Sequence, residues 1–271
     1  MYTPEDRENV LNKLSILFPQ VPNVEGVILV GSGAKGFFDE YSDVDLSVVV
    51  EPAEETNKTW SQINNVIKNN FDVFHYSLTQ YGDNNYLTLF ILTNYLQIDV
   101  GVIALDNLIA KRPLWNILYD KNSRVLEKMK ATEKLKQQKP ISDVSNETTE
   151  NLHYHTQNAA FAIKRNRVFR AAKEIEEIRE LTIKLFGIYN NLETKHHREV
   201  DDFDDSFKKK LIAAVPEKLT IDMLSQSLVK NIDMYFEVIK MVSDTDGWNK
   251  DEMFIKKFIN EVLLLNPEFR L

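Results

Sequence analysis

The spacing of apolar residues predicts that the first 105 residues form a unit of helices and strands. A helix is expected from Thr3 to about Phe18, because apolar residues recur every three or four positions after Thr3-Pro4. The later predicted elements follow in chain order: a strand at 27–30, an alternating strand at 43–50, a helix at 52–69 and strands within 71–105. Strands and helices are therefore expected to pack together in this half.

The second half of the chain is predicted to be helical from Ser145 to its end. Apolar residues recur at helical spacing from Asn151 to Leu192, with a turn expected near Asn166. Further helices are expected at about 206–213, 217–243 and 249–264. The lysine-rich stretch 106–143 is the predicted connection, with one or two short helices. We expect an α+β fold, with a mixed-sheet domain at 1–135 and an α-helical bundle at 136–271.

Two carboxylates stand on one face of the alternating strand 43–50. Asp43, Asp45 and Ser47 share this face because strand side chains alternate, and the other face is apolar. Like charges about 4 Å apart repel by roughly 4 kcal/mol at an effective dielectric constant near 20, so such a pair favours a bound cation. Hard oxygen ligands favour Mg²⁺. Taken alone, an Asp-x-Asp pair at the start of a strand is more often a capping or turn feature.

A turn with three glycines separates the two apolar runs. Gly31, Gly33 and Gly36 end the first strand in a tight loop that can open a helix. Backbone N–H groups in such a loop are suited to phosphate. The pattern therefore predicts a metal-dependent nucleotide site between residues 26 and 48.

The order Gly31-Ser32, ten residues, then Asp43-x-Asp45 resembles the signature of the DNA polymerase β-type nucleotidyltransferase superfamily. The segments 34–36 and 42–46 resemble its small antibiotic-type members, in which arginine is frequent at the position of Lys35. Lysine keeps the positive charge but loses bidentate phosphate geometry. The resemblance implies that 1–135 is a nucleotidyltransferase domain. It also implies that Asp43 and Asp45 bind Mg²⁺, and that Gly31, Ser32 and Lys35 bind the triphosphate.

A third carboxylate, Asp99, lies on an otherwise apolar predicted strand. One interpretation is an aspartate on an edge strand that faces water. The superfamily resemblance favours another, because its third carboxylate typically lies on a strand after the Asp-x-Asp strand. On that resemblance Asp99 is a metal ligand, the general base towards the acceptor hydroxyl, or both.

A basic run lies in the predicted long helix and contains Lys164, Arg165, Arg167, Arg170 and Lys173. Most such runs are solvated faces. The segment nevertheless resembles the helical domain of antibiotic-type enzymes, which implies phosphate contacts for Arg170 and Lys195 and acceptor contacts for Glu174 and Glu177. The acidic residues between 201 and 205 form either a solvated loop or a site for an amine-rich substrate.

Composition and charge narrow the function classes. The chain has 271 residues, 43% of them hydrophobic, and no cysteine, which excludes disulfides and thiolate zinc sites. No zinc site is expected at the histidines. Residues 1–104 hold 5 Lys or Arg against 14 Asp or Glu, within a net charge of -8. This acidity favours Mg²⁺ and cationic small molecules over nucleic acid. With no signal peptide or membrane segment in the pattern, a cytoplasmic protein is expected.

The residues and the resemblance together predict a Mg²⁺-dependent nucleotidyltransferase. An acceptor hydroxyl would attack the α-phosphorus of a nucleoside triphosphate, expected to be ATP, and pyrophosphate would leave. By resemblance the acceptor is a small molecule such as an aminoglycoside or a lincosamide. Two alternatives stay open: transfer to a protein or a tRNA end, and a nucleotide sensor without turnover. Minimal nucleotidyltransferases can be paired with helical toxin domains, which usually carry an arginine followed a few residues later by a histidine. No such pair is found in residues 145–271, so the first alternative is less favoured.

Overall fold

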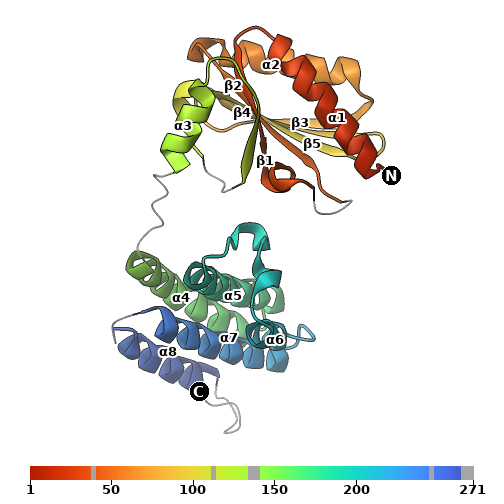
Figure 1. The fold of residues 1–271 in the computed structure, drawn as a ribbon. Helices are drawn as coiled ribbons and strands as arrows, with labels where there is room; N and C mark the ends of the chain where they lie inside the picture. The colour runs from red at the N-terminus through yellow and green to blue at the C-terminus, as the bar shows by residue number, and fades with distance from the viewer. Residues whose placement is uncertain (38–40, 111–113, 134–140, 244–246, 264–271) are drawn as a thin grey trace. The chain divides into compact units, whose positions relative to one another are not determined.

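The computed structural model describes residues 1–37, 41–110, 114–133, 141–243 and 247–263. Within these ranges, Lys35, Ile141 and Ser142 are described by their backbone alone. The chain divides into two compact units, residues 1–137 and 138–271. The first unit contains the sheet and the second contains helices (Figure 1). The predicted α+β class is confirmed. None of the described helices is long and apolar enough to cross a membrane.

The described part of the first unit is built on a six-stranded mixed sheet in the order β3-β4-β5-β2-β1-β6. The strands are β1 (Val24–Val30), β2 (Val44–Val50), β3 (Val73–Gln80), β4 (Asn85–Leu92), β5 (Gln97–Ala104) and β6 (Trp115–Asp120). β2 and β5 pair in parallel, whereas the other neighbours pair antiparallel. The strand β6 was not predicted, because the stretch 106–143 was interpreted as a connection with short helices.

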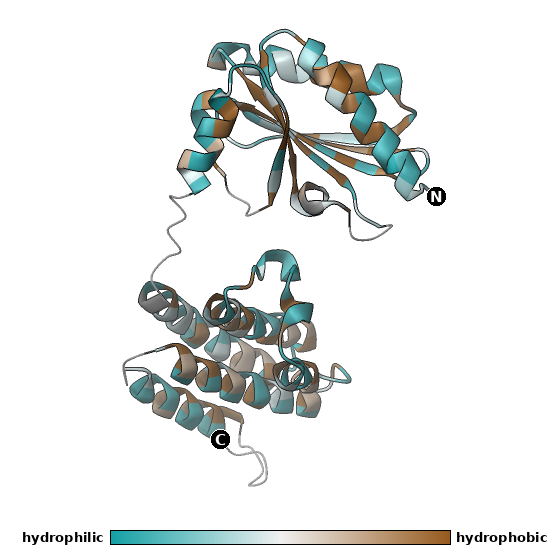
Figure 2. Cartoon of the chain, in the orientation of Figure 1, coloured by the Kyte–Doolittle hydropathy of each residue, from teal (hydrophilic) through white to brown (hydrophobic). Residues whose placement is uncertain are grey.

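Helices cover the two faces of this sheet unequally. One face packs on α1 (Pro4–Leu17) and α2 (Thr56–Asn70), which contribute Leu14, Ile63 and other fully buried side chains to the larger core of this unit. On the other face, α3 (Arg124–Glu133) and residues 105–110 build a smaller core around Ile28 and Val49. Figure 2 shows many hydrophobic residues along the strands and hydrophilic residues on the outer sides of the helices. Among the described residues of this unit, helices therefore cover only part of the second face.

The second unit is a helical bundle with its own core. Its helices are α4 (Ile141–Lys164), α5 (Val168–Asn190), α6 (Asp205–Ala213), α7 (Ile221–Val242) and α8 (Trp248–Leu263). The predicted turn near Asn166 is confirmed: Asn166 has a φ of 55° between α4 and α5. Tyr235 is fully buried in this core, and its hydroxyl lies 3.0 Å from those of Thr148 and Thr149.

Candidate active site

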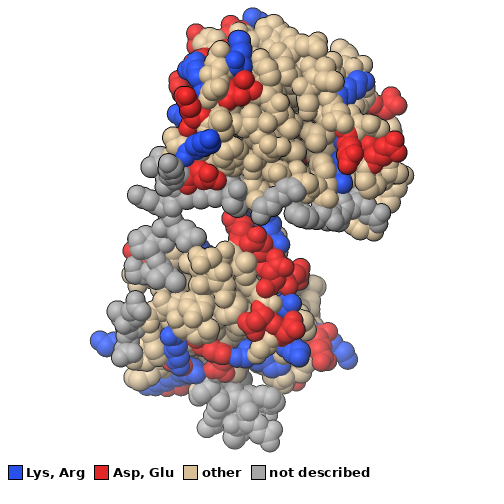
Figure 3. Space-filling model, in the orientation of Figure 1, with Lys and Arg blue, Asp and Glu red and all other residues tan. Residues whose placement is uncertain are grey.

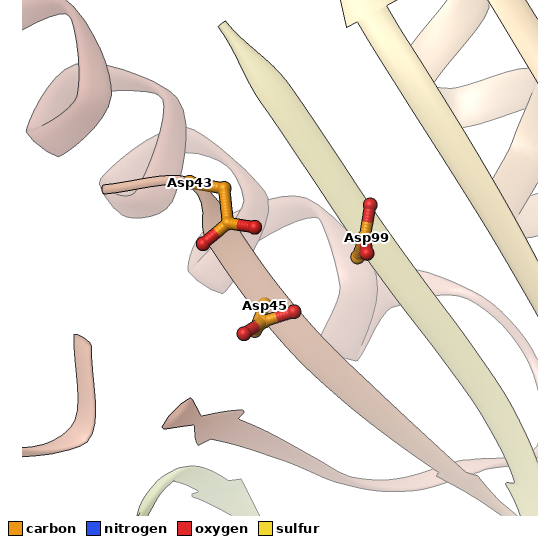
Figure 4. A group of neighbouring side chains, drawn as sticks. All are labelled: Asp43, Asp45 and Asp99. Atoms are coloured by element: carbon orange, nitrogen blue, oxygen red, sulfur yellow. The ribbon is translucent and has the colours of Figure 1, made fainter. Parts of the chain in front are cut away.

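Three aspartates come together on the less covered face of the sheet. Asp43, Asp45 and Asp99 each offer a carboxylate oxygen, and these atoms all lie within 4.8 Å of one another. All three side chains are partly exposed. Figure 4 shows two of them at the start of β2 and the third on the neighbouring strand β5. Three carboxylates this close repel one another unless a cation or a proton lies between them.

The strand register determines this geometry. In the parallel ladder between β2 and β5, Asp45 is the direct partner of Asp99. Alternation directs Asp45 and Ser47 to the face that carries Val49 and α3, whereas Val44 and Leu46 point into the larger core. Because β5 lies between β4 and β2, the interpretation of Asp99 as an edge-strand residue is wrong. The Gln97 amide, two residues earlier on the same face, donates a 3.0 Å hydrogen bond to Asp99 Oδ1.

The glycine loop follows β1 as a short 3₁₀ turn, Gly31–Lys35. Gly31 and Gly36 have φ of 74° and 87°, a conformation that side-chain-bearing residues rarely adopt. The Gly31 N–H donates to the Leu114 carbonyl at 3.3 Å, and the Gly36 N–H donates to the Gly33 carbonyl at 3.1 Å. The 3₁₀ turn uses later N–H groups of the loop for its own i to i+3 bonds, so a phosphate site here would rely on Ser32 and the start of the turn. The Lys35 side chain, a predicted phosphate contact, lies outside what the structure describes.

Sequence reasoning missed a buried arginine that supports this loop region. Arg7 on α1 is only 2% exposed; it donates to the Ser42 carbonyl at 3.2 Å, and its guanidinium carbon lies 3.8 Å from the centre of the Phe37 ring. The Tyr2 hydroxyl donates to the same carbonyl at 3.2 Å. The helix α1 therefore does more than pack on the sheet, because Arg7 also fixes the residue that precedes Asp43.

The basic run of the second unit borders an open cavity of about 670 Å³ at the turn between α4 and α5. Its lining includes the side chains of Arg165, Arg167 and Arg170, together with the aromatic rings of Phe161 and Phe169. Arg170 is exposed and donates to Asn158 Oδ1 at 3.4 Å. Lys195 is also exposed and lies in a 3₁₀ turn after α5. These two predicted phosphate contacts belong to the second unit, whereas the three aspartates belong to the first.

The two glutamates expected near an acceptor are already paired. Glu174 is 7% exposed, and one of its carboxylate oxygens lies 2.8 Å from His155 Nδ1. Glu177 accepts a 2.9 Å hydrogen bond from the Lys173 ammonium, which lowers the pKa of Glu177 and raises that of Lys173. Glu174 therefore links α5 to α4, whereas Glu177 pairs within α5.

Comparison with known proteins places these features in context. Residues 6–246 match the family model described as streptomycin adenylyltransferase. Among solved structures, an aminoglycoside 6-adenyltransferase from Bacillus subtilis is 11% identical, with a TM-score of 0.45; the match covers 98% of this chain and 100% of that chain. A nucleotidyltransferase-like protein from Exiguobacterium sibiricum is also 11% identical, with 95% and 90% covered and a TM-score of 0.33. No curated protein matches. The family match spans most of the chain, and it alone carries the assignment.

Proposed function

The chain belongs to the streptomycin adenylyltransferase family, and from that premise we propose that it moves AMP from ATP to a hydroxyl group of a small molecule and releases pyrophosphate. The predicted resemblance to antibiotic-type nucleotidyltransferases is confirmed by the family, so the chain is a nucleotidyltransferase and a nucleoside triphosphate is its co-substrate. The acceptor that we propose is a small hydroxylated molecule of the aminoglycoside or lincosamide kind.

The donor set of the three aspartates fits Mg²⁺. Asp43, Asp45 and Asp99 offer only hard carboxylate oxygens, and these lie close enough to share one ion. We propose that these three residues bind it. When bound, the ion would neutralise charge on the triphosphate and polarise the phosphoryl group. The acidic composition of residues 1–104 supports cation binding at this place.

We propose that Asp99 accepts the proton of the acceptor hydroxyl. As that oxygen forms its bond to the α-phosphorus, the bond from phosphorus to the pyrophosphate oxygen breaks, and the proton moves to a carboxylate oxygen of Asp99. The hydrogen bond from Gln97 to Oδ1 orients this carboxylate. Asp45, its neighbour across the ladder, would hold the metal rather than the proton.

The phosphate contacts that we propose are Ser32 with the start of the turn, and the cationic groups of Lys35, Arg170 and Lys195. Gly31 contributes through its backbone conformation, since its N–H is bonded to Leu114. Cationic and N–H donors stabilise the charge that develops on the leaving pyrophosphate. Figure 3 shows charged side chains towards the edges of the visible face of the first unit, around a largely uncharged area.

The observation that carries this proposal is the cluster of three carboxylates. Its test is Mg²⁺-dependent pyrophosphate release from ATP, with the double variant Asp43→Asn and Asp45→Asn. We expect release to fall at least about 100-fold, and the thermal shift produced by ATP with Mg²⁺ to disappear. Asp83→Asn is the matched control, because Asp83 is an exposed carboxylate in a turn of the same unit. Native release in the double variant would show that the proposal is wrong.

A further inference from the structure

A cavity of about 240 Å³ adjoins two of the three carboxylates, Asp45 and Asp99. Ser47 and Gly101 lie behind them on the same strands. The rest of its described lining is apolar and includes Ile28, Leu87, Leu108, Ile109, Trp115 and Met129. These residues come from β1, β4, β6, α3 and the segment after β5. A volume of this size accommodates an aromatic ring or a branched alkyl group, since a cavity of about 150 Å³ already binds benzene.

The surface on the other side of Asp99 has the same character. Leu89 is the ladder partner of Asp99, and Leu87 and Ile91 lie on the same face of β4. All three are partly exposed leucine or isoleucine side chains. The side chains of Leu87, Leu89 and Ile91 offer no hydrogen-bond acceptor, so an amine or guanidinium placed against them would lose water without a partner from the strip itself. A hydrocarbon group placed there would gain from leaving water.

We propose that this cavity receives an apolar ring or alkyl group of the acceptor. The substrate class is then a hydroxylated molecule that carries an apolar group next to its reacting hydroxyl, rather than a sugar that is polar and cationic throughout. This inference rests on the proposed function, because it places the reacting hydroxyl at Asp99. It narrows the choice between aminoglycoside-like and lincosamide-like acceptors.

The lining distinguishes the acceptor from the pyrophosphate end of the nucleotide as the occupant. It contains Asp99, the proposed proton acceptor, but neither Asp43 nor a residue of the 31–36 loop among the residues that the structure describes. In an in-line displacement the attacking oxygen and the leaving pyrophosphate lie on opposite sides of the phosphorus. A cavity that begins at Asp99 and excludes the loop is therefore on the acceptor side.

The test uses benzyl alcohol, a hydroxyl group joined to an apolar ring, as the probe. Its binding is followed on the full chain by the NMR signal of the Trp115 indole N–H, assigned with Trp115→Phe. Ile109→Asp is the test variant, since Ile109 lines the cavity and is 49% exposed, so that the aspartate is tolerated by the fold. Ile16→Asp is the matched control, because Ile16 is 65% exposed on α1, which packs on the opposite face.

We expect a saturable shift of the Trp115 signal in the native protein and in Ile16→Asp, and a dissociation constant at least tenfold higher in Ile109→Asp. Ethanolamine, a cationic hydroxyl compound, should leave the Trp115 signal in place. The inference is overturned if benzyl alcohol produces no saturable shift, if ethanolamine binds as tightly, or if ATP with Mg²⁺ displaces benzyl alcohol, which would assign the cavity to the nucleobase.

This test separates the inference from the proposed function. ATP binding is measured on the same samples with Mg²⁺ or EDTA, for the native protein and for Asp45→Asn. If ATP binding does not depend on Mg²⁺ and Asp45, the proposed function fails, whatever benzyl alcohol does. If ATP binding depends on both and the Trp115 signal does not respond to benzyl alcohol, the inference alone fails.

Discussion

Asp45 and Asp99 face each other as direct partners in the parallel ladder between β2 and β5. Their carboxylates share one face of the sheet with Asp43. Parallel partners have side chains on the same face, so the backbone holds the two carboxylates together whether or not a cation is bound. The fold thus maintains an unfavourable charge cluster for the sake of the site.

The first prediction follows from this repulsion. In EDTA, Asp99→Asn should raise the free energy of unfolding by on the order of 1 kcal/mol, because it removes one of three neighbouring negative charges. Asparagine can still accept the hydrogen bond from Gln97. With Mg²⁺ and ATP, pyrophosphate release should fall about 100-fold or more. Urea unfolding in EDTA measures the first effect; equal stability of variant and native protein would show that the carboxylates do not repel in the apo state.

The second prediction concerns Arg7. Arg7→Met keeps an apolar stem against Phe37 but removes the donor to the Ser42 carbonyl, and we expect a loss of about 1 to 3 kcal/mol in stability. Because Ser42 precedes Asp43, the thermal shift produced by ATP with Mg²⁺ should also become smaller. Glu8→Met on the same helix is the control and should change stability by less than about 0.5 kcal/mol, since Glu8 is exposed. A native ATP shift in Arg7→Met would limit Arg7 to packing.

The third prediction compares two strand glycines. A methyl group at Gly26 would lie 2.7 Å from Val125 Cγ2 and 3.1 Å from the Tyr119 carbonyl oxygen, so Gly26→Ala should cost about 1 to 3 kcal/mol. At Gly101 the nearest atom, the Leu46 carbonyl oxygen, would be 3.7 Å away, which is an ordinary contact. Gly101→Ala should therefore be neutral or slightly stabilising. Thermal unfolding checks the predicted order of stability, in which Gly26→Ala is the less stable variant. This order would be reversed if α3 could move away from β1.

The fourth prediction is a pH dependence in the second unit. Burial opposes ionisation of Glu252, but its ion pairs with Lys256 and Lys240, both at 3.0 Å, outweigh this and lower its pKa below the usual 4.5. A depressed pKa stabilises the folded state above the unfolded pKa, and this stabilisation is lost as the pH falls through the folded value. Glu252→Gln should thus be less stable than the native protein at pH 7, by about 0.5 to 1 kcal/mol, and the difference should shrink below pH 4.5.

Urea unfolding between pH 7 and pH 4 measures this difference. Glu261→Gln is the control on the same helix, because Glu261 is 67% exposed and lies 3.8 Å from its nearest ammonium. It should show little effect at any pH. A difference for Glu252→Gln that stays constant across the range would show that the ion pairs do not lower the pKa of Glu252.

Much of the fold could be predicted from the sequence where one face of an element is fully buried. The alternation over 43–50 predicted β2, because Val44, Leu46 and Val48 are buried while Asp45 and Ser47 are partly exposed. The strand β6 gave no such signal. It is an edge strand whose side chains are partly or fully exposed on both faces, so its pattern does not alternate, and lysine-rich segments flank it.

The candidate site could be predicted only in part. Asp43 and Asp45 share a strand, so local periodicity places them together, whereas Asp99 joins them through the pairing of strands that are distant in the chain. Periodicity gives no information about such pairings, so Asp99 was assigned to the site only through the superfamily resemblance. Arg7 and the apolar cavity were missed for the same reason, since Arg7, Leu108 and Trp115 reach the site through tertiary contacts alone.

The connection between β2 and β5 has a consequence for engineering. It runs through α2, β3 and β4 and includes the exposed turn at residues 81–83, where Gly82 has a φ of 84°. Exposed turns of this kind are the sites at which a chain tolerates cleavage. A break there leaves Asp43 and Asp45 on one fragment and Asp99 on the other. The complete carboxylate cluster then exists only when the two fragments reassemble, so metal-dependent ATP binding would report the reunion of two separately expressed halves of one sheet.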